Sequence, residues 1–78
     1  MTERERAVAA IVAGVLGTAE IAVNEDFFDA GGDSPGAVQL ISLLDERFGV
    51  KVPMRRFLAD PTPAGIAGFL DALCPALE

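Results

Sequence analysis

Apolar residues recur at helical spacing along this 78-residue chain, and no segment shows the strict alternation of a half-buried strand. The first such segment lies between Ala7 and Gly17, where the apolar positions follow one another at steps typical of one helical face. Thr2 and Glu5 have the spacing of a capping box at its start, and Gly17 is a typical helix stop. Gly14, inside the segment, indicates a close contact with another helix. A chain of this length supplies one domain, so residues 1–78 are expected to form a single all-helical unit.

A second helix is predicted from Ser34 to Gly49. Ser34 is a good N-cap, and Pro35 suits the first helical position because the N–H that it lacks would be unpaired there. Gly49 ends the helix. The predicted apolar face consists of Ala37, Leu40, Ile41, Leu44 and Phe48.

Two further helical segments follow. Residues Met54–Ala59 are expected to form a short helical turn with Phe57 and Leu58 facing inward. Thr62 and Pro63 then repeat the combination of cap and proline that starts a helix. The apolar face and the end of this last helix are predicted from Ile66, Phe69, Leu70, Leu73, Cys74 and Pro75.

The segment between the first two helices, residues 18–33, has no hydrophobic period and contains several turn-forming residues. Phe27 and Phe28 in its middle are interpreted as anchors that attach the loop to the core. Long ordered loops in small domains are usually functional. The fold class is therefore predicted as all-α: a small four-helix bundle of three main helices and one short third helix, with a long loop between helices one and two.

Composition excludes several classes of function. The formal charge is −6, which argues against nucleic acid as a partner, and the lack of histidine removes the commonest general base and metal ligand. We expect no enzyme activity and no metal site. No apolar run is long enough to span a bilayer, no secretory signal is expected, and Cys74 is the only cysteine. A cytoplasmic monomer is expected.

The acidic residues are concentrated in one part of the chain. No lysine or arginine occurs between Arg6 and Arg47, and the interval contains seven acidic residues. One interpretation is a solvated acidic face; the other is electrostatic steering toward basic partners. The charge pattern alone leaves both open.

The centre of this acidic zone holds the main candidate site. Two glycines permit tight backbone geometry just before Ser34, whose hydroxyl is expected near the surface at the positive end of a helix. Ser34 is either a simple cap or a modified serine. The match of Gly32–Gly36 to the G-x-S-x-G hydrolase motif is accidental, because that motif needs a sheet and a histidine. The neighbouring sequence also fails the EF-hand and P-loop patterns.

The run from Asp26 to Ser34, DFFDAGGDS, resembles the signature of the peptidyl carrier (thiolation) domains of nonribosomal peptide synthetases, within the wider acyl carrier protein superfamily. The resemblance extends over most of the chain and includes the run DPTPAGIAGFL from Asp60 to Leu70. It implies that a phosphopantetheinyl transferase, using coenzyme A and magnesium, attaches 4′-phosphopantetheine to Ser34. The arm would carry an aminoacyl or peptidyl thioester between adenylation, condensation, tailoring or thioesterase enzymes.

The resemblance also assigns roles to neighbouring residues. Asp33 is expected to meet the transferase, and Gly32 belongs to the double glycine before it. Val38 is expected to contact partner enzymes, although an ordinary surface residue is equally consistent with its position. Pro35 stands where the family usually has Leu or Ile in partner contacts, a departure that bears on transferase recognition and partner choice.

Two other functions fit the sequence. One is an acyl carrier protein of a polyketide or fatty acid pathway, which shares the chemistry and differs in cargo. The other is an acidic helical adaptor that binds partners without modification. A stand-alone carrier and a domain of a larger synthetase are both compatible with the residues.

Overall fold

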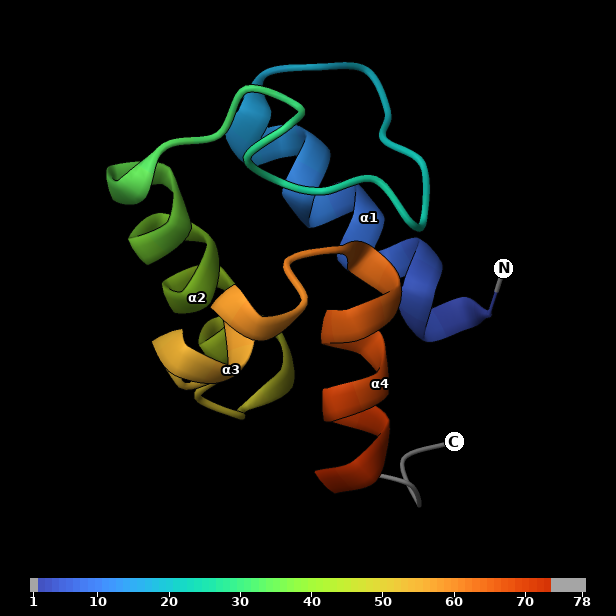
Figure 1. Cartoon of the computed structure of the whole chain (residues 1–78). Helices are drawn as coiled ribbons and strands as arrows, with labels where there is room; N and C mark the ends of the chain where they lie inside the picture. Colours follow the sequence, from blue (N-terminus) through green and yellow to red (C-terminus); the bar gives the residue numbers. More distant parts are fainter. Residues whose placement is uncertain (1, 74–78) are drawn as a thin grey trace.

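The computed structural model describes residues 2–73, and all regular structure in that part of the chain is helical (Figure 1). The four helices are α1 (Glu3–Leu16), α2 (Ser34–Phe48), α3 (Met54–Ala59) and α4 (Pro63–Leu73). This confirms the predicted arrangement of three main helices and a short third one. The long loop between α1 and α2 also agrees with the prediction, since residues 18–33 form only turns, bends and irregular backbone. No helix within residues 2–73 has the length and apolar character needed to cross a membrane.

The ends of α1 are those that the sequence predicts. The Glu5 backbone N–H donates to Thr2 Oγ1 at 3.0 Å, and the Thr2 N–H donates to Glu5 Oε1 at 2.8 Å, which completes the capping box. Gly17 ends the helix with a φ of 74°, a left-handed conformation that glycine adopts without strain. The expected helix contact at Gly14 is wrong, because a Cβ placed there would meet nothing within 4 Å.

The start of α2 differs by one residue from the prediction. Asp33, and not Ser34, is the N-cap: its backbone is extended, and its Oδ1 accepts the Gly36 N–H at 2.9 Å. Ser34 and Pro35 are consequently the first and second helical residues. Aspartate is as good an N-cap as serine, so when both occur together the first of them can take the role. Gly49 ends the helix in the left-handed conformation, with a φ of 70°.

The start of α4 agrees with the prediction, because Thr62 Oγ1 accepts the Gly65 N–H at 3.0 Å. Its last described turn does not bury the side chain expected there, since Leu73 is 55% exposed. The predicted helix end at Cys74 and Pro75 lies outside the described residues.

In α3 only one of the two predicted inward residues is buried. Phe57 is fully buried, whereas Leu58 is 53% exposed. Adjacent positions on a helix differ by about 100° in direction, so a helix of six residues that points Phe57 at the core turns Leu58 away from it.

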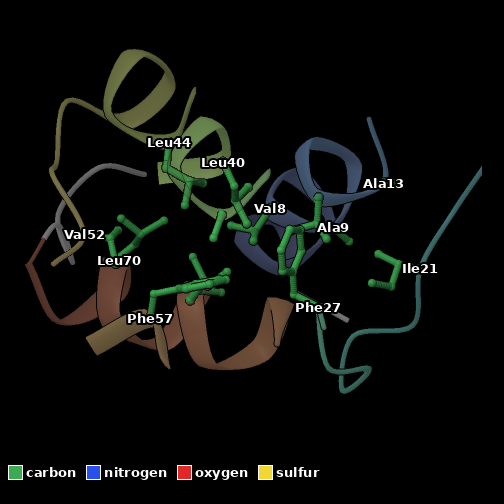
Figure 2. Close-up of a cluster of buried hydrophobic side chains, with 14 residues drawn as sticks. Val8, Ala9, Ala13, Ile21, Phe27, Leu40, Leu44, Val52, Phe57 and Leu70 are labelled. Atoms are coloured by element: carbon green, nitrogen blue, oxygen red, sulfur yellow. The ribbon is translucent and has the colours of Figure 1, made fainter. Parts of the chain in front are cut away.

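The core lies between α1, α2 and α4, and α1 packs against both of the others. Figure 2 shows the Phe27 ring reaching from the long loop toward the side chains of α1, while Phe57 enters from α3. The largest fully buried side chains are Phe27, Phe57, Leu40, Leu44, Leu70, Val8, Val12, Val52 and Pro63. A single aromatic residue from the loop is therefore part of the same core that holds the helices together.

Arg4 is a charged residue within this mostly apolar packing. Its Nε lies 3.5 Å from Asp71 Oδ1, and its guanidinium carbon lies 5.4 Å from the centre of the Phe48 ring. The side chain thus connects the start of α1 with the end of α4 and the end of α2. Among residues 2–73, Arg4 is the charged residue that is buried.

Candidate functional site

Ser34 is exposed at the first position of α2, where the chain leaves the long loop (Figure 1, green). Because Asp33 supplies the cap, the Ser34 hydroxyl is not used to cap the helix. The site therefore presents a hydroxyl to solvent at a helix N-terminus, where the helix dipole favours a negative group.

Phe27 anchors the loop that leads to this serine. Its ring makes edge-to-face contacts with Phe28 and Phe57, at centroid distances of 5.2 and 5.6 Å. Its backbone N–H donates to the Pro61 carbonyl at 2.8 Å, and Ala64 N–H donates to the Val23 carbonyl at 2.8 Å. The prediction that the phenylalanine pair attaches the loop is confirmed, with Phe27 fully buried and Phe28 half-buried.

The structure explains why glycine is needed at both positions before Asp33. Gly31 has a φ of 107°, which side-chain-bearing residues rarely adopt. Gly32 has no positive φ, but a Cβ on it would overlap the Phe27 ring. Its N–H donates to the Phe27 carbonyl at 3.0 Å, so backbone and ring are held together there. The position of Ser34 thus depends on a close contact between a glycine and the loop anchor.

One of the acidic residues in this zone stabilises the loop itself. Asp26 Oδ1 accepts the backbone N–H of Phe28 at 2.7 Å and that of Asp29 at 3.2 Å. Its carbonyl accepts the Ala30 N–H at 2.9 Å. Asp26 therefore belongs to a local turn, while Asp29 and Asp33 are exposed and contribute to the outer charge.

Most backbone N–H groups in the first turn of α2 are absent or already hydrogen-bonded. Pro35 has no N–H, the Gly36 N–H is bonded to the Asp33 side chain, and the Ala37 N–H is bonded to the Asp33 carbonyl. The N–H of Ser34 is the remaining donor of this turn. An ester on the exposed Ser34 hydroxyl fits this geometry, because nothing in the helix start has to be broken to accommodate it.

Exposed apolar side chains lie on α2 just after Ser34 and, separately, on α3. Val38 is 59% exposed and sits one turn after Ser34 on α2, and Pro35 is exposed beside it. Met54 and Leu58 of α3 are also exposed and lie four residues apart, on one face of that helix. The sequence reasoning missed these two, because it placed Leu58 inside and made no assignment for Met54.

The acidic residues do not assemble into a metal site. Within residues 2–73, no group of three or more Asp, Glu, Cys or His side chains is placed to hold a metal ion. The candidate site is therefore built from the Ser34 hydroxyl, the Asp33 cap beside it, and the exposed Pro35 and Val38 on the same helix.

Comparison with known proteins identifies the family. The profile described as "Phosphopantetheine attachment site" matches residues 6–70. The chain belongs to this family. Its members bind phosphopantetheine, so the cofactor implied by the resemblance is confirmed.

Curated relatives come from nonribosomal peptide synthesis. The chain is 43% identical over 70 residues to tyrocidine synthase 3 from Brevibacillus parabrevis, and 37% identical over 70 residues to indigoidine synthase from Streptomyces lavendulae. Each alignment covers 90% of the chain, but only 1% of the first synthase and 6% of the second. A dimodular nonribosomal peptide synthase of Bacillus subtilis is 35% identical and is covered over 3% of its length. The chain thus spans only a small part of the length of these relatives.

Solved structures show the same fold. A peptidyl carrier protein in complex with the phosphopantetheine transferase Sfp and coenzyme A superposes with a TM-score of 0.89 at 25% identity, over 92% of this chain and 94% of that one. BlmI, a type-II acyl carrier protein from Streptomyces verticillus, gives a TM-score of 0.83 at 32% identity, over 88% and 83% of the two chains. These matches confirm the carrier-protein fold and the similarity to peptidyl carrier proteins.

Proposed function

We propose that Ser34 carries the phosphopantetheine arm and that the chain shuttles an aminoacyl or peptidyl group between partner enzymes. The observation that supports Ser34 most directly is its exposed hydroxyl at the first position of α2, left out of the cap by Asp33. The other serine, Ser42, lies in the middle of α2 and is preceded by no glycine-containing turn.

In this proposal the chain presents the site and contributes no catalytic step. The arm supplies a thiol that holds the cargo as a thioester. Phe27 and the double glycine hold the loop so that Ser34 faces solvent, and Asp33 keeps the first turn of α2 closed. Ser34 Oγ forms the bond to phosphorus and loses its proton, while the adenosine 3′,5′-bisphosphate part of coenzyme A leaves.

The proposed partners are a phosphopantetheinyl transferase and an adenylation enzyme, followed by condensation, tailoring or thioesterase enzymes. Asp29 and Asp33 give the surface beside Ser34 a negative charge that favours partners with basic contact surfaces. Pro35 and Val38 supply apolar contact next to the arm. A monomer suits repeated weak docking, and a cytoplasmic location suits a reaction that consumes coenzyme A.

A second candidate function is an acyl carrier protein of a polyketide or fatty acid pathway. The structural similarity to BlmI, which is described as a type-II acyl carrier protein, supports this alternative. Loading the holo protein with an aminoacyl group by an adenylation enzyme, and separately with a malonyl group by an acyltransferase, distinguishes the two. The peptidyl proposal predicts that aminoacyl loading predominates.

Loading with coenzyme A tests the attachment step. The purified chain is incubated with coenzyme A, magnesium and a broad-specificity phosphopantetheinyl transferase, and its intact mass is measured. We expect the gain of one phosphopantetheine group. The Pro35→Leu variant tests the departure from the family pattern: faster loading would show that the proline slows the transferase. A folded chain that is loaded in neither form would contradict the proposal.

A further inference from the structure

The positive charge in the second half of the chain gathers around α3. Lys51, Arg55 and Arg56 are all exposed, in a protein whose formal charge is −6. Within residues 2–73, the salt bridge found joins Arg4 to Asp71. Lys51 and Arg55 are therefore not paired with an acid in that part of the chain. At physiological ionic strength charges are screened beyond about 8 Å, so a partner close to α3 meets this local cluster more than the net charge.

The two arginines border an open groove between α3 and α4 of about 530 Å³. We call it the basic groove; its lining residues are Pro53, Arg55, Arg56, Ala59 and Phe69. The guanidinium carbon of Arg56 lies 5.3 Å from the centre of the Phe69 ring, and the rest of the lining is mainly apolar. The groove thus combines an apolar floor with two cationic side chains.

The acidic residue that lies nearest in sequence to Arg55 and Arg56 is bonded to the start of α4 and not to these arginines. Asp60 follows α3 directly, but its Oδ1 accepts the Thr62 hydroxyl at 2.9 Å, and a Cβ on Gly65 would overlap its carboxylate. Its carboxylate is therefore turned to the start of α4. The cations of the groove are left to meet an acid from another molecule.

The basic groove lies on a different face of α3 from the exposed apolar residues of that helix. Met54 and Leu58 are four positions apart and share one face, whereas Arg56 and Ala59 are displaced from that face by roughly 100–200° of helical rotation. A partner can therefore contact the groove without covering the exposed apolar face of α3.

We propose that the basic groove docks an acidic, leucine-bearing segment of a partner protein. Carboxylates of the segment would pair with Arg55 and Arg56, and an apolar side chain would cover the floor formed by Phe69 and Ala59. Nucleic acid is a poorer occupant, because an extended polyanion would also meet the acidic loop and α2. A simple anion is poorer too, since it would leave the apolar floor uncovered.

The test uses the full apo chain, labelled with nitrogen-15, and a blocked peptide of sequence Glu-Leu-Glu-Glu-Leu-Glu. Amide shifts are followed during titration by nuclear magnetic resonance. We expect saturable shifts centred on the α3–α4 groove that weaken as salt is raised. Two control peptides replace leucine by alanine or glutamate by lysine, and both are expected to bind several-fold more weakly.

Charge reversal locates the site. Arg55→Glu and Arg56→Glu are each expected to weaken binding about fivefold. Arg6→Glu, which changes an exposed arginine of α1 by the same charge, is expected to have less than about a twofold effect. Equal weakening by Arg6→Glu, shifts centred elsewhere, or equal binding of the alanine peptide would overturn the proposal. Because the apo chain carries no arm, the outcome of this titration does not depend on the attachment proposal, and failure of either one leaves the other standing.

Discussion

The contact between Gly32 and the Phe27 ring gives the sharpest test of how the loop is held. Gly32 has no positive φ, so alanine is compatible with its backbone and the effect of Gly32→Ala comes from the new methyl group alone. That methyl would overlap a fully buried ring at the centre of the core. Inserting a carbon into a packed core usually costs about 1–3 kcal/mol, which is the destabilisation that we expect.

Urea unfolding followed by circular dichroism measures this change. With a slope of about 1 kcal/mol per molar urea for a domain of this size, the midpoint should fall by roughly 1–3 M. Thermal unfolding should shift downward by about 4–8 °C for each kcal/mol. Loading of Ser34 should slow as well, because the strained contact lies two residues before it.

Gly14→Ala is the matched control. Gly14 lies within α1 and a Cβ there meets nothing within 4 Å, so alanine should raise stability by about 0.5–1 kcal/mol. The same substitution is thus predicted to have opposite signs at the two positions. A Gly32→Ala variant as stable as the parent would refute the reasoning.

A second variant checks the cause. Phe27→Leu replaces the ring with a smaller side chain, which leaves room for the new methyl group. It should therefore lower the free energy of unfolding less in the Gly32→Ala background than in the parent, with a coupling of about 1 kcal/mol between the two changes. Additive effects would show that Gly32 acts through something other than the ring.

Substitutions at three further sites, with their controls, test the caps and the buried charge by urea unfolding. Asp33→Ala should cost about 1 kcal/mol because the Gly36 N–H loses its acceptor, and Asp33→Asn should restore most of it; equal losses in both would count against the cap. Gly49→Ala should cost about 1–2 kcal/mol because φ is positive there, and no loss would contradict that geometry. Arg4→Ala should cost about 1–3 kcal/mol, against less than about 0.5 for the exposed Arg6→Ala, and similar values for the two would show that Arg4 is not a bridge between helices.

Local signals in the sequence were sufficient to predict most of the helix boundaries. The capping box at Thr2 and Glu5 and the stop at Gly17 involve residues at most four positions apart, so the chain fixes them without tertiary contacts. The start of α2 shows where such signals fail. Asp33 and Ser34 are both good caps, and the choice between them depends on the backbone torsions that the anchored loop imposes.

Contacts between distant segments were beyond the reach of the sequence pattern. The short α3 spans less than two turns, so its hydrophobic period was too brief to show that Leu58 faces outward. The glycine pattern suggested a tight turn before Ser34, but the reason for Gly32 is a ring that enters the core and meets α3. Arg4 gave no signal either, since its partners come from helix ends far along the chain.

Locating the modification within the sequence tests the central claim most directly. After loading with coenzyme A and a transferase, the chain is digested, and tandem mass spectrometry identifies the modified residue in the parent, in Ser34→Ala and in Ser42→Ala. We predict one phosphopantetheine group on Ser34 in the parent and in Ser42→Ala, and none in Ser34→Ala. A group on any other residue, or a Ser34→Ala chain that is still loaded, would contradict the assignment of Ser34 as the attachment site.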